Sequence, residues 1–137
     1  MAKIVLGKRP ETFKKVVKFP MLNGETGEVA CTFRTRTRKE VGALFDRLVA
    51  EAVANAEAAY EAAKEGDESP KLPTQGDMIA AAVDQSAAHI LEVLDGWDVD
   101  LPLNAENAEK FADEFPQGCI AIMKAYREAV VEGTLGN

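Results

Sequence analysis

The stretch TRKEVGALFDRLVAEAVANAEAAYEAAKEG, from Thr37 to Gly66, decides the fold. Thr37 and Glu40 match a capping box, in which two side chains satisfy free backbone N–H groups at a helix start. Apolar residues then recur at helical spacing up to Gly66. The pattern predicts one helix of about 27 residues, roughly 40 Å long. Its apolar positions are Val41, Leu44, Phe45, Leu48, Val49, Ala52, Val53, Ala56 and Tyr60.

A helix of this length extends beyond the core that a chain of 137 residues can build. Its far half, AEAVANAEAAYEAAKE, is rich in alanine. We expect this half to project, or to pack against another helix or another copy of the protein. Small side chains permit close approach of helices, so we predict self-association and take Tyr60 as a candidate residue for it.

Upstream of the helix, two runs alternate apolar and polar residues around Asn23-Gly24, which is the pattern of a β-hairpin. An isolated hairpin is marginal in water, so its apolar face must rest on other elements. The run KIVLG at residues 3–7 is a candidate for a third short strand. The expected inner face of the hairpin carries Phe13, Lys15, Val17, Phe19, Met21, Val29, Cys31 and Phe33.

Three shorter helices are expected downstream. The second helix, capped by Thr74 to Asp77, carries an apolar stripe and stops near Asp95-Gly96; the stripe consists of Ile79, Val83, Ser86, Ile90 and Leu94. An extended segment with Trp97 follows. Asn104 caps the third helix, in which Ala108, Phe111, Ala112 and Phe115 face inward. Pro116 opens the fourth, which Gly133 stops and whose stripe is Cys119, Ile122, Met123, Tyr126 and Val130.

The predicted fold class is therefore α+β, mostly α: an N-terminal β-hairpin, with a possible third short strand, then one long helix and about three shorter helices. We expect a single domain over residues 1–137. It divides into a basic β-hairpin region (1–36), the long helix (37–65), a polar mobile loop (66–76) and the C-terminal helices (77–137).

The net charge of −7 is distributed unevenly. Residues 1–39 carry ten Lys or Arg and three Glu, a balance of +7, whereas the remaining residues have a balance of −14. An acidic majority argues against the whole protein binding nucleic acid. The basic group could form a solvated or self-complementary face, bind an acidic protein, or contact RNA. It consists of Arg34, Arg36, Arg38 and Lys39, with Lys14 and Lys18 on the neighbouring strand.

No arrangement of residues predicts an enzyme, a cofactor or a metal site. The single histidine, His89, lies beside an apolar stripe, where a packed core neighbour is the common outcome. Cys31 and Cys119 are far apart in sequence, which favours reduced thiols in a cytoplasm. We expect no secretion signal and no membrane-spanning segment. Trp97 is either a core anchor or a contact residue in a partner interface.

The whole chain resembles a family of phage tail assembly chaperones from long-tailed phages and prophages. The resemblance is carried by MAKIVLGKRPETFKKVVKFPMLNGETGEVACTFRTRTRKEVGALFDRL at the N-terminus and by ILEVLDGWDVDLPLNAENAEKFADEFPQGCIAIMKAYREAV near the C-terminus. In the second stretch, a tryptophan segment leads into an Asn-capped helix, a Phe-Pro break and an aromatic last helix.

The resemblance implies a non-enzymatic protein of the host bacterial cytoplasm that is absent from the mature virion. Such proteins bind the tape-measure protein, help the tail-tube protein assemble around it and self-associate. A longer form arises by ribosomal frameshifting. Leu135-Gly136-Asn137 can be encoded with the slippery heptamer G GGA AAC. The alternatives are a minor tail or head–tail component of the virion, and a small nucleic-acid-binding regulator using the basic hairpin.

Overall fold

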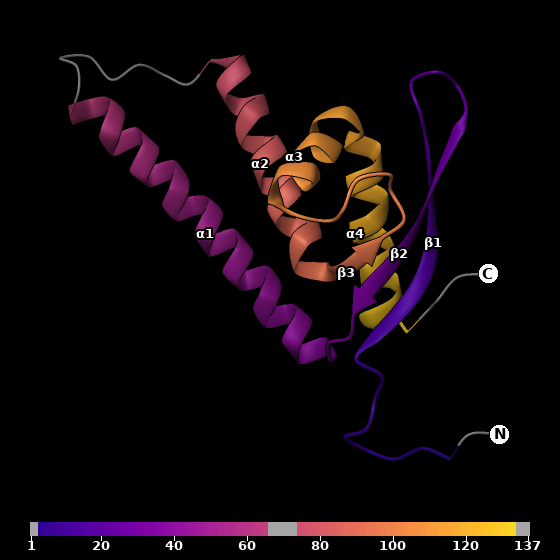
Figure 1. Cartoon of the computed structure of the whole chain (residues 1–137). Coiled ribbons are helices and arrows are strands. Elements are labelled where there is room, and N and C mark those ends of the chain that lie inside the picture. Colours follow the sequence, from indigo (N-terminus) through magenta and orange to yellow (C-terminus); the bar gives the residue numbers. More distant parts are fainter. Residues whose placement is uncertain (1–2, 66–73, 134–137) are drawn as a thin grey trace.

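The computed structural model describes residues 3–65 and 74–133. In this part of the chain, three strands form one antiparallel sheet and four helices lie on one side of it (Figure 1). The fold class is α+β, mostly α, as the sequence predicted. In chain order the elements are β1 (Thr12–Pro20), β2 (Thr26–Arg34), α1 (Arg38–Glu65), α2 (Gln75–Val93), β3 (Leu94–Trp97), α3 (Ala105–Glu114) and α4 (Pro116–Val130).

The predicted hairpin is confirmed. β1 and β2 pair in antiparallel register, with Phe13 opposite Phe33, around a turn in which Gly24 has a φ of +86°. That backbone conformation favours glycine, because a Cβ is strained there. The alternating face is buried as expected, and α4 packs against it. Its buried members are Val17, Phe19, Val29, Cys31 and Phe33.

A third strand exists, but it does not come from residues 3–7. It is β3, which follows α2 directly and pairs antiparallel with β2, giving the strand order β1-β2-β3. Leu94 of β3 is fully buried, whereas Ile4 and Leu6 are 88% and 93% exposed. Residues 3–7 contribute no side chain to the core, so nothing offsets the loss of entropy on ordering them as a strand.

α2 differs from its predicted form at both ends. It ends at Val93 instead of near Asp95-Gly96, because the chain turns there into β3. Ile79, predicted to be in the buried stripe, is 57% exposed, since the first turns of α2 extend past the core. The Thr74 cap is confirmed: its hydroxyl accepts a hydrogen bond from the Asp77 N–H at 3.0 Å. Of the predicted loop 66–76, residues 66–73 lie outside the described residues, and Gln75 already belongs to the helix.

α3 and α4 meet the rest of the core through an aromatic cluster. The Asn104 side chain caps α3 by accepting a hydrogen bond from the Asn107 N–H at 2.8 Å, and Pro116 opens α4, both as predicted. The ring centroids of Trp97 and Phe111 are 5.2 Å apart, and those of Phe19 and Phe111 are 6.1 Å apart in an edge-to-face arrangement. This cluster holds the hairpin, β3 and α3 together.

Two glycines in helices should respond in opposite ways to alanine. A Cβ on Gly118 of α4 would lie 2.6 Å from Cζ of Phe111, whereas a Cβ on Gly42 of α1 meets nothing within 4 Å. We expect Gly118→Ala to lower the free energy of unfolding by about 1–3 kcal/mol through overpacking. Gly42→Ala should raise it by about 0.5–1 kcal/mol, because alanine favours the helix. Urea unfolding measures both; equal effects would contradict the packing described for Gly118.

Candidate partner-binding groove

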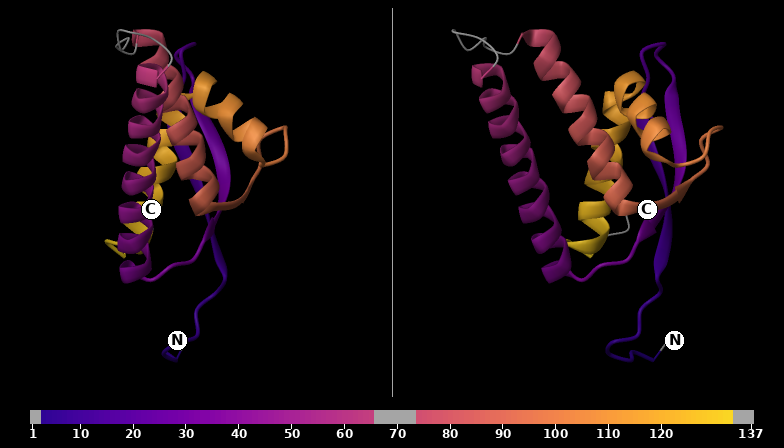
Figure 2. Two further views of the ribbon diagram at one scale, coloured as in Figure 1. Left: turned by 90° about the vertical axis from the view of Figure 1, so that its left-hand side faces the viewer. Right: turned by 60° about the vertical axis from the view of Figure 1, so that its left-hand side comes forward.

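α1 packs on the rest of the protein through its first half only. The buried side chains in the described part of α1 are Val41, Leu44 and Leu48. Beyond Leu48, Ala52 is half-buried and the side chains up to Ala62 are exposed. The ribbon shows the far half of α1 standing apart from the sheet and from α3 and α4 (Figures 1 and 2). The projection predicted for this half is therefore present, and the helix is continuous from Arg38 to Glu65.

A groove of about 300 Å³ lies between α1 and α2. Its floor and walls are mainly alanine methyl groups, so the backbone of a partner helix could approach closely. Its rim is polar and carries two carboxylates, Glu51 and Asp84. The apolar lining consists of Leu48, Ala52, Ala56 and Ala59 from α1 and of Ala81 and Ala88 from α2.

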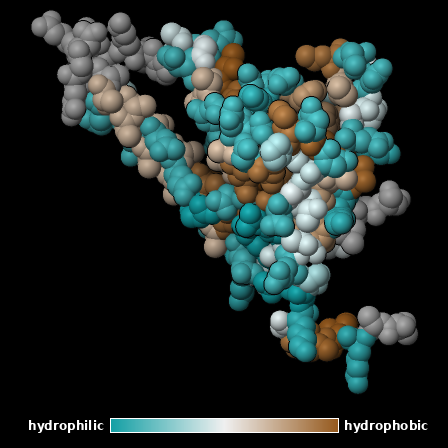
Figure 3. Space-filling model, viewed as in Figure 1, coloured by the Kyte–Doolittle hydropathy of each residue, from teal (hydrophilic) through white to brown (hydrophobic). Residues whose placement is uncertain are grey.

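Larger apolar side chains are exposed next to this groove. Val49, Val53 and Tyr60 are 62%, 51% and 50% exposed and follow one another at helical spacing along α1. Met78 and Ile79 are exposed on the first turns of α2. The space-filling view shows apolar residues exposed along α1 and where α1 joins the body of the molecule (Figure 3). Contiguous exposed apolar surface of this kind is typical of an interaction site.

His89 lies in the wall of the groove on α2. Its Nε2 is buried and has no hydrogen-bond partner among the described residues. Burial lowers the pKa of His89, so the ring is neutral at physiological pH. A neutral, half-buried imidazole adds apolar surface to the wall of the groove.

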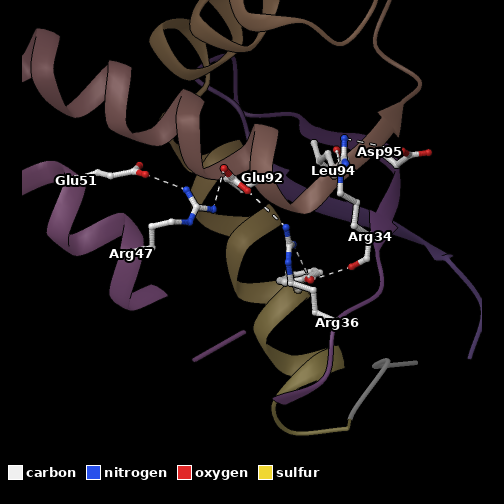
Figure 4. A network of polar contacts seen from close by, with 8 residues as sticks. Arg34, Arg36, Arg47, Glu51, Glu92, Leu94 and Asp95 are labelled. Carbon is white, nitrogen blue, oxygen red and sulfur yellow. Dashed lines mark hydrogen bonds and ion pairs between the residues drawn. The ribbon is translucent and has the colours of Figure 1, made fainter. Parts of the chain in front are cut away.

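A chain of charged contacts fixes the base of α1 against α2 (Figure 4). Arg47 of α1 pairs with Glu92 of α2 at 3.0 Å and with Glu51 at 3.0 Å. The other oxygen of Glu92 pairs with Arg36 at 3.5 Å. The hydrogen bond and ion pair with Glu92 raise the pKa of Arg47. Since all these groups are partly exposed, the ion pairs add little to the free energy of unfolding. Their main effect is to orient α1 relative to α2.

Arg34 and Arg36 are engaged within the molecule. Arg34 donates to the Leu94 carbonyl at 3.1 Å and lies 4.0 Å from Asp95 (Figure 4). Arg36 donates to the Tyr126 hydroxyl at 3.1 Å as well as pairing with Glu92. These two arginines join the hairpin to α2, β3 and α4. Their charges are partly neutralised by the acidic part of the same chain, which is one form of the self-complementary face considered from the sequence.

The other candidate residues lie in separate places. Arg38 and Lys39 are exposed at the start of α1, and Tyr60 lies near its far end. Trp97 is half-buried in β3; its Nε1 donates to the Leu101 carbonyl at 2.8 Å and its ring packs on Phe111. The six candidates therefore do not form one surface. Their proposed roles in binding or self-association stay predictions, and Tyr60 alone lies beside the groove.

The two cysteines are buried as thiols, one in β2 and one in α4. Burial, with a smaller contribution from the Asp98 charge, raises the pKa of Cys31 to about 12, and burial raises that of Cys119 to about 11. Neither is therefore an activated nucleophile. The described residues hold no group of three or more His, Cys, Asp or Glu side chains that could bind a metal ion. Among the helices of residues 3–65 and 74–133, none combines the length and the apolar character of a membrane-spanning segment.

The sequence revealed only one side of the groove. The alanine-rich half of α1 indicated an unpartnered helix face. The contribution of α2 is not predictable from the pattern, because Ile79 belongs to the predicted buried stripe and the alanines at 80–82 and 87–88 fit any face of a helix. The small size of these alanines predicts that the helix can pack closely against another helix. It does not predict which face of the helix does so.

The chain was compared with models of known protein families. The model of a family described as phage tail assembly chaperone matches residues 1–137, the whole length of the chain. Searches of curated proteins and of solved structures found no significant match. The family match agrees with a fold that exposes an apolar groove between α1 and α2. The chain therefore belongs to the phage tail assembly chaperone family.

Proposed function

We propose that this protein is a non-enzymatic chaperone that binds the tape-measure protein and promotes assembly of the tail-tube protein around it. Membership of the family supports a role in tail assembly, with tail proteins as partners. The observation that carries the proposal is the groove between α1 and α2, which leaves half of a long helix without a partner among the described residues. A chaperone needs such a surface to cover apolar parts of another protein before assembly.

The groove fits an amphipathic helix of the tape-measure protein. Helix-in-groove binding places apolar side chains of the partner at helical spacing against an apolar floor. Alanines on both walls permit a close approach, and Leu48 closes the groove at the end near the core. The carboxylates of Glu51 and Asp84 at the rim favour a partner helix with Lys or Arg beside its apolar stripe.

Charges placed in the groove should prevent this binding. The double variant Ala56→Glu/Ala59→Glu introduces two carboxylates into the wall of the groove, which Glu51 also lines. We expect its affinity for the tape-measure protein of the same phage to fall at least about tenfold, because each buried carboxylate must lose water without gaining a partner. Co-purification from cells that express both proteins, followed by calorimetry, measures the change.

The control is Ala50→Glu/Ala54→Glu, which adds the same charges on another face of the same helix. Ala50 and Ala54 are exposed and do not line the groove. This variant should bind as the wild type does. Equal loss in both double variants would indicate a general charge effect, and no loss in either would place the tape-measure site elsewhere on the protein.

We also propose that copies of the chain associate through the exposed apolar stripe of α1. Val49, Val53 and Tyr60 lie on the flank of the helix beside the groove wall and have about half or more of their surface exposed. Val53→Asp/Tyr60→Asp should shift the protein toward a monomer in sedimentation velocity. Glu57→Asp/Glu61→Asp, on the same half of α1, is the matched control and should leave the association unchanged. A wild-type protein that is monomeric at all concentrations would refute the proposal.

We further propose that the protein acts in the host bacterial cytoplasm, is absent from the mature virion, and has a longer form made by frameshifting. Quantitative mass spectrometry of infected cells should detect this chain, and peptides that continue it in the −1 frame. The same measurement on purified particles should detect neither. Stoichiometric amounts in particles would instead support the alternative of a minor tail or head–tail component.

A further inference from the structure

β1 forms one edge of the sheet, and no strand pairs with its outer side in the part of the chain that the structure describes. The register shows which backbone groups are free. The Met21 N–H bonds to the Glu25 carbonyl and the Thr35 N–H bonds to the Glu11 carbonyl, so odd-numbered residues of β1 face β2. The N–H and C=O groups of the even-numbered residues must then point away from the sheet; these residues are Thr12, Lys14, Val16 and Lys18.

A groove of about 360 Å³ runs along this edge, between β1 and α4. One wall is β1 from Lys15 to Pro20, and the other is one face of α4. Ile120 of α4, a large aliphatic residue, is 59% exposed here, and Val16 is 51% exposed on the other face of β1. A strand added to β1 would therefore gain backbone hydrogen bonds and could place alternate side chains against α4.

Lysine side chains around the β1 edge favour an acidic partner. The side chains of Lys15 and Lys124 lie on the groove side, whereas Lys14 and Lys18, at even positions, project from the other face of β1. The acidic side chain in the lining is Glu128, which lies 3.9 Å from Lys124. Lys18 pairs with Glu28 at 3.7 Å, an exposed contact that an incoming carboxylate can replace. The edge is thus basic in a chain whose net charge is −7.

A second copy of the same edge is a poor occupant. Antiparallel pairing of two β1 strands about Val16 would place Lys14 of one copy opposite Lys18 of the other. Like charges directly opposite each other destabilise a strand pair. The lysines thus act against pairing of two chaperone copies at this edge, while they favour an acidic strand.

From this geometry we infer that the β1 edge and the groove beside α4 bind an extended acidic segment of a partner protein by strand addition. The segment has apolar residues at alternate positions, which lie over Ile120 and Ala121, and Asp or Glu between them, which meet the lysines. This surface is separate from the groove between α1 and α2 and uses a different type of recognition. The protein therefore has two binding surfaces, one for a helix and one for a strand.

The probe is a short synthetic peptide of alternating valine and glutamate, blocked at both ends. Amide hydrogen exchange is followed by NMR on the full chain with and without peptide. The amides of Lys14, Val16 and Lys18 should gain protection. The amides of Lys15 and Val17, already bonded to β2, should change little. Equal gains of protection at even-numbered and odd-numbered residues of β1 would overturn the inference. So would protection of α1 and α2 instead of β1, or absence of binding.

Two changes to the peptide test its mode of binding without altering the protein. N-methylation of alternate backbone nitrogens removes the donors that strand addition requires, and should abolish binding. Replacement of each glutamate by lysine should also abolish it. If the N-methylated peptide bound as well as the parent, the attraction would be charge alone and the strand-addition proposal would be wrong.

Variants of the protein complete the test. Val16→Pro removes an outward N–H that β2 does not use, which an edge strand tolerates, and should weaken peptide binding about fivefold. Val16→Thr keeps the N–H and is the matched control. Lys14→Glu/Lys18→Glu should abolish binding, because these two lysines lie on the face that meets the carboxylates of the segment. Lys39→Glu, a charge reversal of one residue at the start of α1, should not. Equal affinity of Val16→Pro and Val16→Thr would contradict the proposed backbone pairing.

Discussion

The arrangement of the molecule depends on Tyr126, which is fully buried where α4 crosses the hairpin. Its ring lies against Phe13 and Phe33, with centroids 6.2 Å and 5.5 Å away. Its hydroxyl donates to the Arg34 carbonyl at 2.8 Å and accepts from Arg36. One side chain thus fixes the sheet on α4 and holds the short connection into α1. Burial of the phenol raises its pKa, so the hydroxyl stays protonated and remains a donor at physiological pH.

The position of α1 follows from this connection. Arg36 forms an ion pair with Glu92, and Glu92 also pairs with Arg47. These contacts hold the first turns of α1 against the end of α2. The remaining turns extend past the core, where alanines replace the larger residues of the first half. The first half of α1 is packed on the core and its second half is exposed, so the angle between α1 and α2 is fixed before a partner binds. Such a groove loses little conformational entropy when a partner helix enters it.

Local rules predicted most of the fold. The alternation in the hairpin, the Thr37, Thr74 and Asn104 caps and the Pro116 start each depend on neighbouring residues, and each is present. Features set by distant contacts were missed. β3 exists because β2 offers it an edge, and the burial of Leu94 in a strand depends on that pairing. The same holds for the site: the exposed half of α1 was predicted, whereas the α2 wall and the free edge of β1 required the tertiary structure.

The central claim is that the groove between α1 and α2 receives the tape-measure protein. The most direct measurement places a photo-crosslinking amino acid at Ala59, in the groove wall, or at Ala50, on another face of α1, in cells assembling tails. The account predicts crosslinks to the tape-measure protein from position 59 and few from position 50. Crosslinks to that protein from position 50 alone, or only to copies of this chain from position 59, would contradict it.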